Sequence, residues 1–591
     1  MTESTLLSPD PAPAPSRWRR ALVVATIFGA GAYGFGWLAG RDDSGTIPSQ
    51  AMMMSVMLGP ILALLGFALW WVARGDGRFR RRVLGVVAVG ASVGVSVLVA
   101  HSTMRLFAAI WGVPLTAAIT GLALAAVPVV RSWPTAGLIA LTALSPWLAL
   151  RLDGVSGKFD MDTSYRWVPS VAERAAEQLA SRATVVPTGP IAELIPESPL
   201  DWPGFRGAHR DGVVAAVAAH GWNGSAPRER WRKEPVGPAW SSFSAAGAFI
   251  YTQEQRGDSE SVVCYQADTG DEVWARGEPG KHSDGPSGIG PRATPTCANG
   301  RVFAATASGT IMCLRATDGE PVWVVSLAER FGVTKPTFGY AASPLVTGNR
   351  VFINPSSKTG PRLVALDAAT GATQWEVETR GTEGYSSPHP ATIAGVSQVL
   401  IFNGAGLFGH DPETGRELWK YDWVTAQNEP TTVQPLALAD GRIVIGGGNV
   451  GIGTRCVKVE NSGSNWSASE VWKTSRFTPK FNDVVRVGKY LYGLDSGALV
   501  CLKLADGSRA WKEGQYGAGQ VLLVGDNLLV VSETGQLACV AAKPDEFEEL
   551  WKIDAVKGKT WNHPIIARGR LYLRNATVMV AFDLPGWSAN P

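Results

Sequence analysis

One phrase recurs along the C-terminal part of the chain and limits the folds open to it. It consists of a short apolar strand, a polar turn ending in glycine, and a tryptophan a few residues later, as in VVCYQADTGDEVW and LVALDAATGATQW. The tryptophans of the successive copies are Trp231, Trp274, Trp323, Trp375, Trp419, Trp472, Trp511 and Trp551. They stand 39 to 53 residues apart, a period that accommodates four short strands.

Four-stranded units repeated at this length predict a β-propeller, in which blades are arranged radially around a channel. The two ends of the repeat complement each other. The last copy, RLYLRNATVMVAFDLP, has no tryptophan strand after it, whereas the strand at Trp231 has no strands before it. We therefore expect both ends to build an eighth blade that closes the ring and leaves no free sheet edge, with seven blades as the alternative.

The repeated tryptophans and cysteines are both interpreted as packing residues. A large flat side chain at one blade position is expected to dock neighbouring blades. Small residues occupy one equivalent strand position, namely Cys264, Cys313, Ala365, Gly409, Cys456, Cys501 and Cys539. Equivalent positions on successive blades lie beyond the roughly 7 Å limit for a disulfide, so we expect all six cysteines to be free and buried.

The first 150 residues follow different rules from the repeat. They hold 11 arginines, no lysine and 5 acidic residues, and they contain five uncharged runs, at 21–40, 52–73, 83–100, 106–130 and 134–150. Crossing a bilayer takes roughly 20 apolar helical residues. The sequence thus predicts a cytoplasmic tail at 1–20 and a domain of about five transmembrane helices at 21–150, with four as the alternative because the fifth run is short.

Arginine placement sets the expected orientation. The arginines before the first run and after the second are Arg17, Arg19, Arg20, Arg74, Arg78, Arg80, Arg81 and Arg82. Such clusters stay on the cytoplasmic side, so five spans deliver the rest of the chain to the outer side. We expect an integral protein of the bacterial cytoplasmic (inner) membrane with a periplasmic propeller. The runs carry no acid or lysine, which favours an anchor over a transporter.

Residues 151–200 form the predicted connection to the propeller domain at 201–591. Ser170 and Glu173 have the spacing of a capping box and predict a short juxtamembrane helix. Prolines from Pro187 onward predict a stiff spacer. The chain after residue 150 has 43 basic and 46 acidic residues, a net charge of −3, which argues against a nucleic-acid partner.

The alternation of Ala-Xaa-Thr-Gly turns and tryptophan strands resembles the PQQ-like repeat of quinoprotein alcohol dehydrogenase-like propellers over about residues 201–584. The opening DWPGFRGAHRDG at 201–212 and the preceding spans resemble membrane-anchored, BamB-like members of this group. The resemblance implies either a scaffold that contacts proteins or a dehydrogenase holding PQQ and Ca²⁺ in the channel. The sequence departs from the dehydrogenases, since it has neither adjacent cysteines nor a CxxCH haem site.

Polar residues stand where the innermost strand of each blade is expected to begin, at the mouth of the channel. The candidate ligand-binding residues are Arg292, Ser343, His389, Gln434, Asn482, Asp483, Gln520, Asn562 and His563. Radial symmetry is expected to gather them into one annulus in which Arg292 meets a carboxylate or quinone oxygen, Asp483 a cation or hydroxyl, and His389 transfers protons near a pKa of about 6.5. Hydration and structural hydrogen bonding are the alternative role.

The sequence assigns no catalytic residue and no metal. We expect a membrane-anchored extracytoplasmic propeller that acts as a scaffold for envelope proteins or a small ligand, with no certain cofactor. The alternative is a PQQ-dependent dehydrogenase of alcohols or aldoses that uses the central channel.

Overall fold

The computed structural model describes residues 79, 83, 98–105, 145, 147–156, 161–180, 198–284, 287–357, 361–378, 383–423, 431–447, 452–463 and 465–588. The chain divides into two compact units, residues 1–153 with 162–168 and residues 154–161 with 169–591. Within the residues described, no helix is both long and apolar enough to cross a bilayer. The five predicted spans lie outside these residues except for 83, 98–100, 145 and 147–150.

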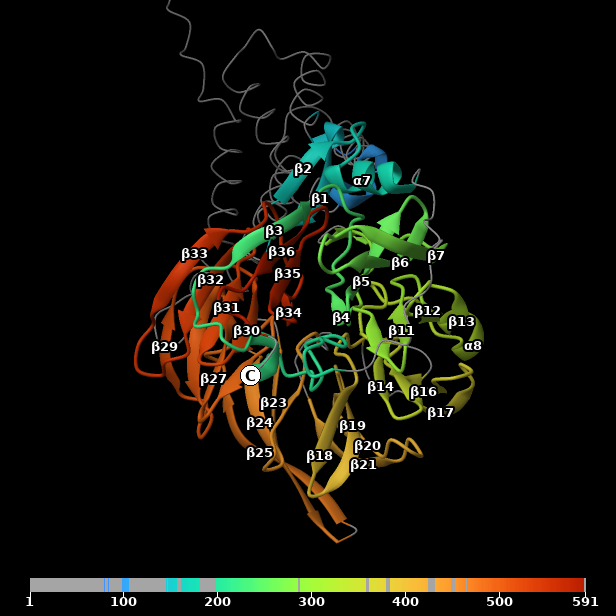
Figure 1. Cartoon of the computed structure of the whole chain (residues 1–591). Helices are drawn as coiled ribbons and strands as arrows, with labels where there is room; N and C mark the ends of the chain where they lie inside the picture. The colour runs from blue at the N-terminus through green and yellow to red at the C-terminus, as the bar shows by residue number, and fades with distance from the viewer. Residues whose placement is uncertain are drawn as a thin grey trace, which may run out of the picture. The chain divides into compact units, whose positions relative to one another are not determined.

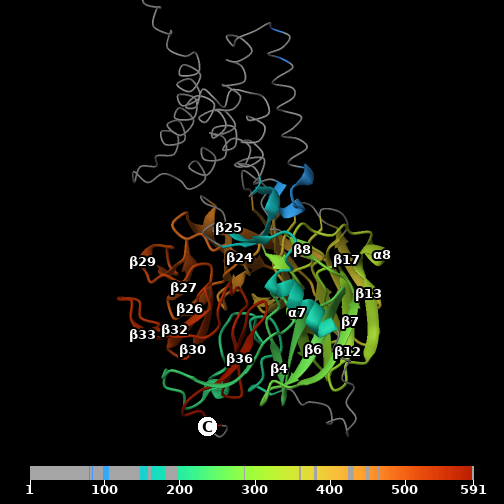
Figure 2. The ribbon, with the colours of Figure 1, turned by 90° about the horizontal axis from the view of Figure 1, so that it is seen from above.

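The short elements before the repeat are a 3₁₀ helix and a hairpin in the first unit and a helix in the second. They are η1 (Ser102–Met104), β1 (Leu150–Val155), β2 (Met161–Tyr165) and α7 (Val171–Ala180). The predicted capping box at the start of α7 is confirmed, because the Ser170 amide donates to Glu173 Oε2 over 2.8 Å and the Glu173 amide donates to Ser170 Oγ over 3.1 Å. α7 lies beside blade 1, where the Gly257 amide donates to Ala176 O (Figure 2).

The second unit is an all-β propeller of eight four-stranded antiparallel sheets, which confirms the predicted number of blades (Figure 1). Blade 1 is β4 (Ser244–Ala246), β5 (Phe249–Arg256), β6 (Ser259–Gln266) and β7 (Glu272–Pro279). Blade 2 is β10 (Thr296–Ala298), β11 (Arg301–Ala305), β12 (Thr310–Arg315) and β13 (Pro321–Ser326). Blade 3 is β14 (Leu345–Thr347), β15 (Arg350–Ile353), β16 (Pro361–Asp367) and β17 (Thr373–Glu378). Blade 4 is β18 (His389–Ile393), β19 (Val396–Asn403), β20 (Gly406–His410) and β21 (Glu417–Asp422).

The remaining blades follow the same order from the channel outward. Blade 5 is β22 (Leu436–Ala437), β23 (Arg442–Gly447), β24 (Gly453–Ser462) and β25 (Asn465–Thr474). Blade 6 is β26 (Val485–Val487), β27 (Tyr490–Asp495), β28 (Ala498–Lys503) and β29 (Arg509–Glu513). Blade 7 is β30 (Gln520–Val524), β31 (Asn527–Val531), β32 (Gln536–Ala541) and β33 (Glu549–Asp554). Smaller elements lie between blades, namely η4 (Ala216–Ala219), β8 (Ser283–Asp284), β9 (Gly288–Ile289) and α8 (Leu327–Phe331).

Both ends of the repeat build blade 8, as predicted. Three of its strands are β34 (Ile565–Ala567), β35 (Arg570–Arg574) and β36 (Met579–Asp583), and the outermost is β3 (Arg228–Lys233). β3 pairs antiparallel with β36, with Trp231 opposite Ala581. The ring is therefore closed by hydrogen bonds between segments near opposite ends of the propeller sequence.

The tryptophans dock one blade on the next, which confirms their predicted packing role. The indole N–H of Trp274, for example, donates to Ala316 O of blade 2 over 3.1 Å, and the ring covers the turn glycine of that blade, Gly319, where an added Cβ would lie 2.5 Å from the ring. Trp419 is the exception, because its indole donates to Gln398 in its own blade over 2.7 Å.

Each tryptophan stands opposite a small residue of the neighbouring strand, as in the pairs Cys264 with Trp274 and Gly409 with Trp419. The reason is steric, since a Cβ at Gly409 would lie 2.4 Å from the Trp419 ring. All six cysteines are free and buried, as expected. Burial raises the pKa of Cys313 and Cys539 to about 12.

Candidate functional site at the channel centre

The residues two positions before the innermost strands form a chain of hydrogen bonds that runs from blade to blade, here called the inter-blade ring. In each link a backbone N–H donates to a side-chain oxygen at the equivalent position of the next blade. The links are Ser242 N to Thr294 Oγ1 (3.0 Å), Thr294 N to Ser343 Oγ (2.9 Å), Ser343 N to Ser387 Oγ (2.9 Å), Ser387 N to Gln434 Oε1 (2.9 Å) and Gln434 N to Asp483 Oδ1 (2.7 Å). Five links thus join blades 1 to 6.

Amide side chains continue these links through blades 7 and 8. Gln520 Nε2 donates to Phe481 O over 3.1 Å and to Trp561 O over 2.9 Å. Asn562 Nδ2 donates to Ser241 O over 2.8 Å, and the Ser242 hydroxyl donates to His563 O over 2.5 Å. Most of the predicted polar residues are therefore engaged in structural hydrogen bonds between blades, which is the alternative role that the sequence left open.

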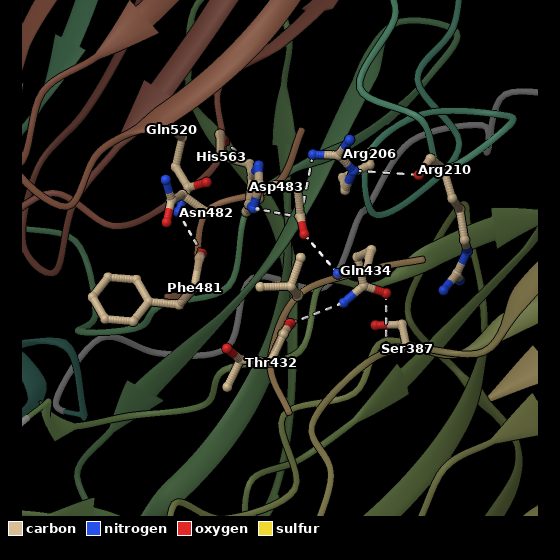
Figure 3. Close-up of polar contacts among 12 residues, drawn as sticks. Arg206, Arg210, Ser387, Thr432, Gln434, Phe481, Asn482, Asp483, Gln520 and His563 are labelled. Carbon is tan, nitrogen blue, oxygen red and sulfur yellow. Dashed lines mark hydrogen bonds and ion pairs between the residues drawn. The ribbon is translucent and has the colours of Figure 1, made fainter. Parts of the chain in front are cut away.

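A segment before the first blade enters the channel, here called the plug segment and defined as residues 201–214. Its ends are held by isolated bridges, Trp202 to Ala245 of blade 1 and Val213 to Leu523 of blade 7. Between them, Arg206 and Arg210 both adopt positive φ, 60° and 56°, and are buried with 3% and 4% exposure. The loop therefore directs two guanidinium groups into the centre of the ring (Figure 3).

Arg206 meets the one carboxylate among the predicted site residues. Its Nη1 lies 3.2 Å from Asp483 Oδ2, and the two side chains are 2% and 4% exposed. Arg206 Nη2 donates to Val484 O over 2.9 Å and to Asp211 O over 2.8 Å. Since Asp483 Oδ1 accepts the ring hydrogen bond from Gln434, both oxygens of this carboxylate are engaged by the chain itself.

Arg210 is held by carbonyl groups. Its Nη1 donates to Ser343 O over 3.2 Å and to Pro388 O over 3.0 Å, and its Nη2 donates to Pro344 O. Burial lowers its pKa to about 9, because the charged form loses its hydration. The two arginines therefore cross-link the plug segment to blades 3, 4 and 6.

Two histidines lie next to these arginines and are held neutral. Burial, together with the charges of Arg210 and Arg206, lowers the pKa of His389 to about 3. Burial and the charge of Arg206 likewise lower the pKa of His563 to about 4, although Asp483, 3.8 Å away, opposes the shift. The expectation that His389 transfers protons near pH 6.5 is therefore wrong, because desolvation removes its protonated form.

Two predicted site residues have partners elsewhere. Arg292 pairs with Asp284 on the β8–β9 hairpin and donates to Ser287 Oγ over 2.8 Å, so it does not face Asp483. Burial alone raises the pKa of Asp284, but hydrogen bonds from His282 and Ser287 and the charge of Arg292 hold it well below its usual range. Asn482 is used within blade 6, where its Nδ2 donates to Leu494 O over 2.6 Å.

Calcium and a quinone cofactor require oxygen ligands that are free to coordinate the cation. Asp483 is the only carboxylate of the nine predicted residues, and a guanidinium occupies the side on which a cation would bind it. Asn482 Oδ1 accepts the Lys480 N–H over 3.0 Å, whereas Asn562 Oδ1 and Gln520 Oε1 are buried without a hydrogen-bond partner among the residues described. Among the nine predicted residues the one carboxylate is thus neutralised by Arg206, and the two neutral amide oxygens without a partner do not by themselves fit a Ca²⁺–quinone pair.

The plug segment was not predicted to be part of the site, although it contains the motif at 201–212. A pocket of about 590 Å³ at the other ends of the innermost strands was not predicted either. The plug segment lines this pocket together with the ends of β4, β10 and β14. The sequence signal for this segment was its two arginines among glycines. Because the segment lies outside the repeat, comparison of the blades does not predict where these arginines lie in the ring.

Part of the propeller matches a known family. Residues 258–513, from β6 to β29, match the family described as outer membrane protein assembly factor BamB. No curated protein matches the chain.

Several solved structures have a similar fold. BamB from Moraxella catarrhalis is 16% identical, with 61% of this chain and 100% of that chain covered at a TM-score of 0.45. A europium-containing methanol dehydrogenase is 12% identical, with 67% and 100% covered at 0.42. The quinohemoprotein alcohol dehydrogenase from Comamonas testosteroni is 13% identical, with 71% and 85% covered at 0.36.

Proposed function

We propose that this chain is a membrane-anchored, extracytoplasmic propeller that acts as a scaffold through the outer surfaces of its blades. The ion pair of Arg206 with Asp483 carries the proposal. It fills the ring centre with groups of the chain itself, at the place where the dehydrogenase alternative requires a cation and a quinone. We therefore expect the faces and edges of the blades to bind the partner, which we expect to be another envelope protein.

The anchor is supported by contacts between the ends of two apolar runs. Residues 98–105 span the end of the third run, and residues 148–152 span the end of the fifth. The Leu152 amide donates to Thr103 Oγ1 over 3.0 Å, and Arg166 Nη1 donates to Val99 O over 2.8 Å. If the runs cross the membrane alternately, the ends of the third and fifth emerge on the same side, as these contacts require.

The BamB-like sequence of residues 258–513 supports a scaffold role for the propeller. The name of that family describes a factor in outer membrane protein assembly, and it is the basis for expecting a protein partner in the envelope. The arginine clusters on either side of the first two runs support the outer location of the propeller.

Alkaline phosphatase fusions test the location. The enzyme fused after residue 160 should be active, and fused after Arg80 it should be inactive. The reverse result would contradict the five-span arrangement.

An oxidation assay tests the scaffold against the dehydrogenase. Purified full-length chain is incubated with PQQ and Ca²⁺, and oxidation of alcohols and aldoses is followed with an artificial electron acceptor. We expect no activity above that measured without PQQ and Ca²⁺. Activity that requires both PQQ and Ca²⁺ would establish the dehydrogenase instead.

A further inference from the structure

Exposed apolar side chains gather in the first unit, in what is here called the aromatic patch. Its members, with their exposed fractions, are Leu98 (68%), Val99 (53%), Tyr165 (57%), Trp167 (67%) and Val168 (40%). The rings of Tyr165 and Trp167 are stacked with centroids 5.3 Å apart and planes inclined by 11°. A stacked and exposed aromatic pair is unusual on a surface that only meets water, and it indicates a site of interaction.

Hydrogen bonds fix this patch at the ends of the third and fifth apolar runs. The Arg166 amide donates to Ala149 O over 2.8 Å, and Arg166 Nη1 donates to Val99 O over 2.8 Å and to Leu148 O over 3.4 Å. The Val168 amide closes a turn onto Tyr165 O over 2.9 Å. The chain thus leaves the fifth run, turns through the β1–β2 hairpin, and returns Tyr165 and Trp167 to the level of residue 149.

Arginines accompany the aromatic patch. Arg166 lies between its two aromatic residues in sequence, and Arg105 Nη2 donates to Leu98 O over 3.2 Å; both arginine side chains are exposed. Amphipathic aromatic rings beside arginines are the combination that proteins place at the level of lipid headgroups, where one end of the residue is apolar and the other is wet.

The propeller offers an internal comparison. Its exposed large hydrophobic residues are aliphatic and lie on separate elements, as Leu550 does in the outer strand ELWKID with 44% exposure, although Val322 and Val324 share the outer strand β13. Scattered residues of this kind are normal on a soluble surface. The aromatic patch differs because its members come from two chain segments that hydrogen bonds hold together.

We propose that the aromatic patch lies in the headgroup region of the bilayer, with Trp167 and Tyr165 at the boundary of the acyl chains and with Arg105 and Arg166 at the lipid phosphates. The proposal rests on the membrane anchor proposed above. The patch then fixes the depth at which the chain leaves the membrane, before α7 begins.

A fluorescent label at one position tests this. Because the six native cysteines are all buried, a thiol introduced by Trp167→Cys is the one that a polarity-sensitive maleimide dye modifies in the folded chain. The full-length protein is reconstituted in nanodiscs of phosphatidylcholine and phosphatidylglycerol. Leu550→Cys, at an exposed position on β33 (44%), is the control outside the patch, and Tyr165→Cys (57%) is a second test position.

We expect the dye at positions 167 and 165 to emit at shorter wavelength than at 550 and to be quenched several-fold by brominated lipids, while the dye at 550 is not quenched. If the dyes at 165 and 167 emit and are quenched like the dye at 550, in protein that stays bound to the nanodisc, the aromatic patch does not contact lipid. The proposal of a membrane anchor is then retained, and that of the aromatic patch is rejected. If the folded protein elutes without the nanodisc, the anchor itself is wrong, and the aromatic patch proposal falls with it.

Discussion

The Arg206 guanidinium lies 3.2 Å from the Asp483 carboxylate in the centre of the ring, with both side chains almost fully buried. Arg206 belongs to the plug segment and Asp483 to the loop before β26, so the pair joins the part of the chain that precedes the blades to blade 6. A buried pair of this kind is costly to break, because the remaining charge is left without a partner and without water.

Removing one charge of this pair should destabilise the propeller strongly. Asp483→Asn keeps an oxygen that accepts the Gln434 N–H but leaves Arg206 unpaired, so we expect a loss of about 3–5 kcal/mol in the free energy of unfolding. Thermal melting monitored by tryptophan fluorescence measures it. Lys233→Ala breaks the exposed pair with Asp271 and should have little effect. Equal effects of the two variants would show that the central pair contributes no more than a surface pair.

Substitutions at two glycines distinguish the effect of backbone strain on stability from the effect of blade packing. Gly319 has φ +74° and faces the Trp274 ring, whereas Gly348 has φ +58° and no atom within 4 Å of an added Cβ. Alanine at either position strains the backbone, but Gly319→Ala also displaces the docked tryptophan. We expect Gly319→Ala to lower the melting temperature clearly more than Gly348→Ala. Similar melting temperatures would show that the docking of Trp274 tolerates an extra methyl group.

The central histidines should make the propeller less stable in acid. Their pKa values are about 3 for His389 and about 4 for His563 in the folded chain, against about 6.5 when unfolded. Between about pH 4 and 6.5 the unfolded chain therefore binds more protons, and stability should fall by about 1.4 kcal/mol per pH unit for each histidine as the pH falls. This contribution is complete above pH 6.5.

Melting temperatures recorded from pH 4 to 7 measure this slope. His389→Gln should flatten the profile, and His209→Gln, which alters an exposed histidine of the plug segment, should leave it unchanged. A profile of His389→Gln that is as steep as that of the native chain would exclude this histidine as the cause.

The six thiols should not react with a thiol reagent until the propeller unfolds. All are buried, and burial raises the pKa of Cys297 to about 12 and of Cys501 to about 11, so the reactive thiolate is scarce at pH 8. A chromogenic disulfide reagent should modify none of them in the native protein and all six in denaturant. Fast modification without denaturant would mean that a blade opens locally.

The blades were predictable because the repeat supplies its own alignment. Each tryptophan strand marks one blade, and the unmatched strand at Trp231 indicated how the eighth is completed. The polar residues at the strand starts were found for the same reason, since equal positions in the repeat occupy equal positions in the ring. What they do was harder to predict, because a serine that binds a ligand and a serine that accepts an N–H from the next blade look the same in sequence.

The plug segment could not be placed from sequence, because it lies outside the repeat. The partners of Arg206 and Arg210 are mainly backbone carbonyls of distant blades, such as Val484 O and Pro388 O, and carbonyls carry no sequence signal. Arg292 shows the converse limit. The repeat places Arg292 correctly, shortly before an innermost strand. Its side chain nevertheless pairs with a nearby acid, Asp284, and not with a residue of the annulus.

The pairing of Trp231 with Ala581 also determines when, during synthesis of the chain, the ring can close. A ribosome adds roughly 5–20 residues per second, so β3 waits on the order of 20–70 s for the strand that it must join. During that interval seven blades can form in sequence while the eighth position offers an unpaired sheet edge to any neighbouring chain. Cells that make this protein therefore have a reason to shield the nascent ring until its last strand arrives.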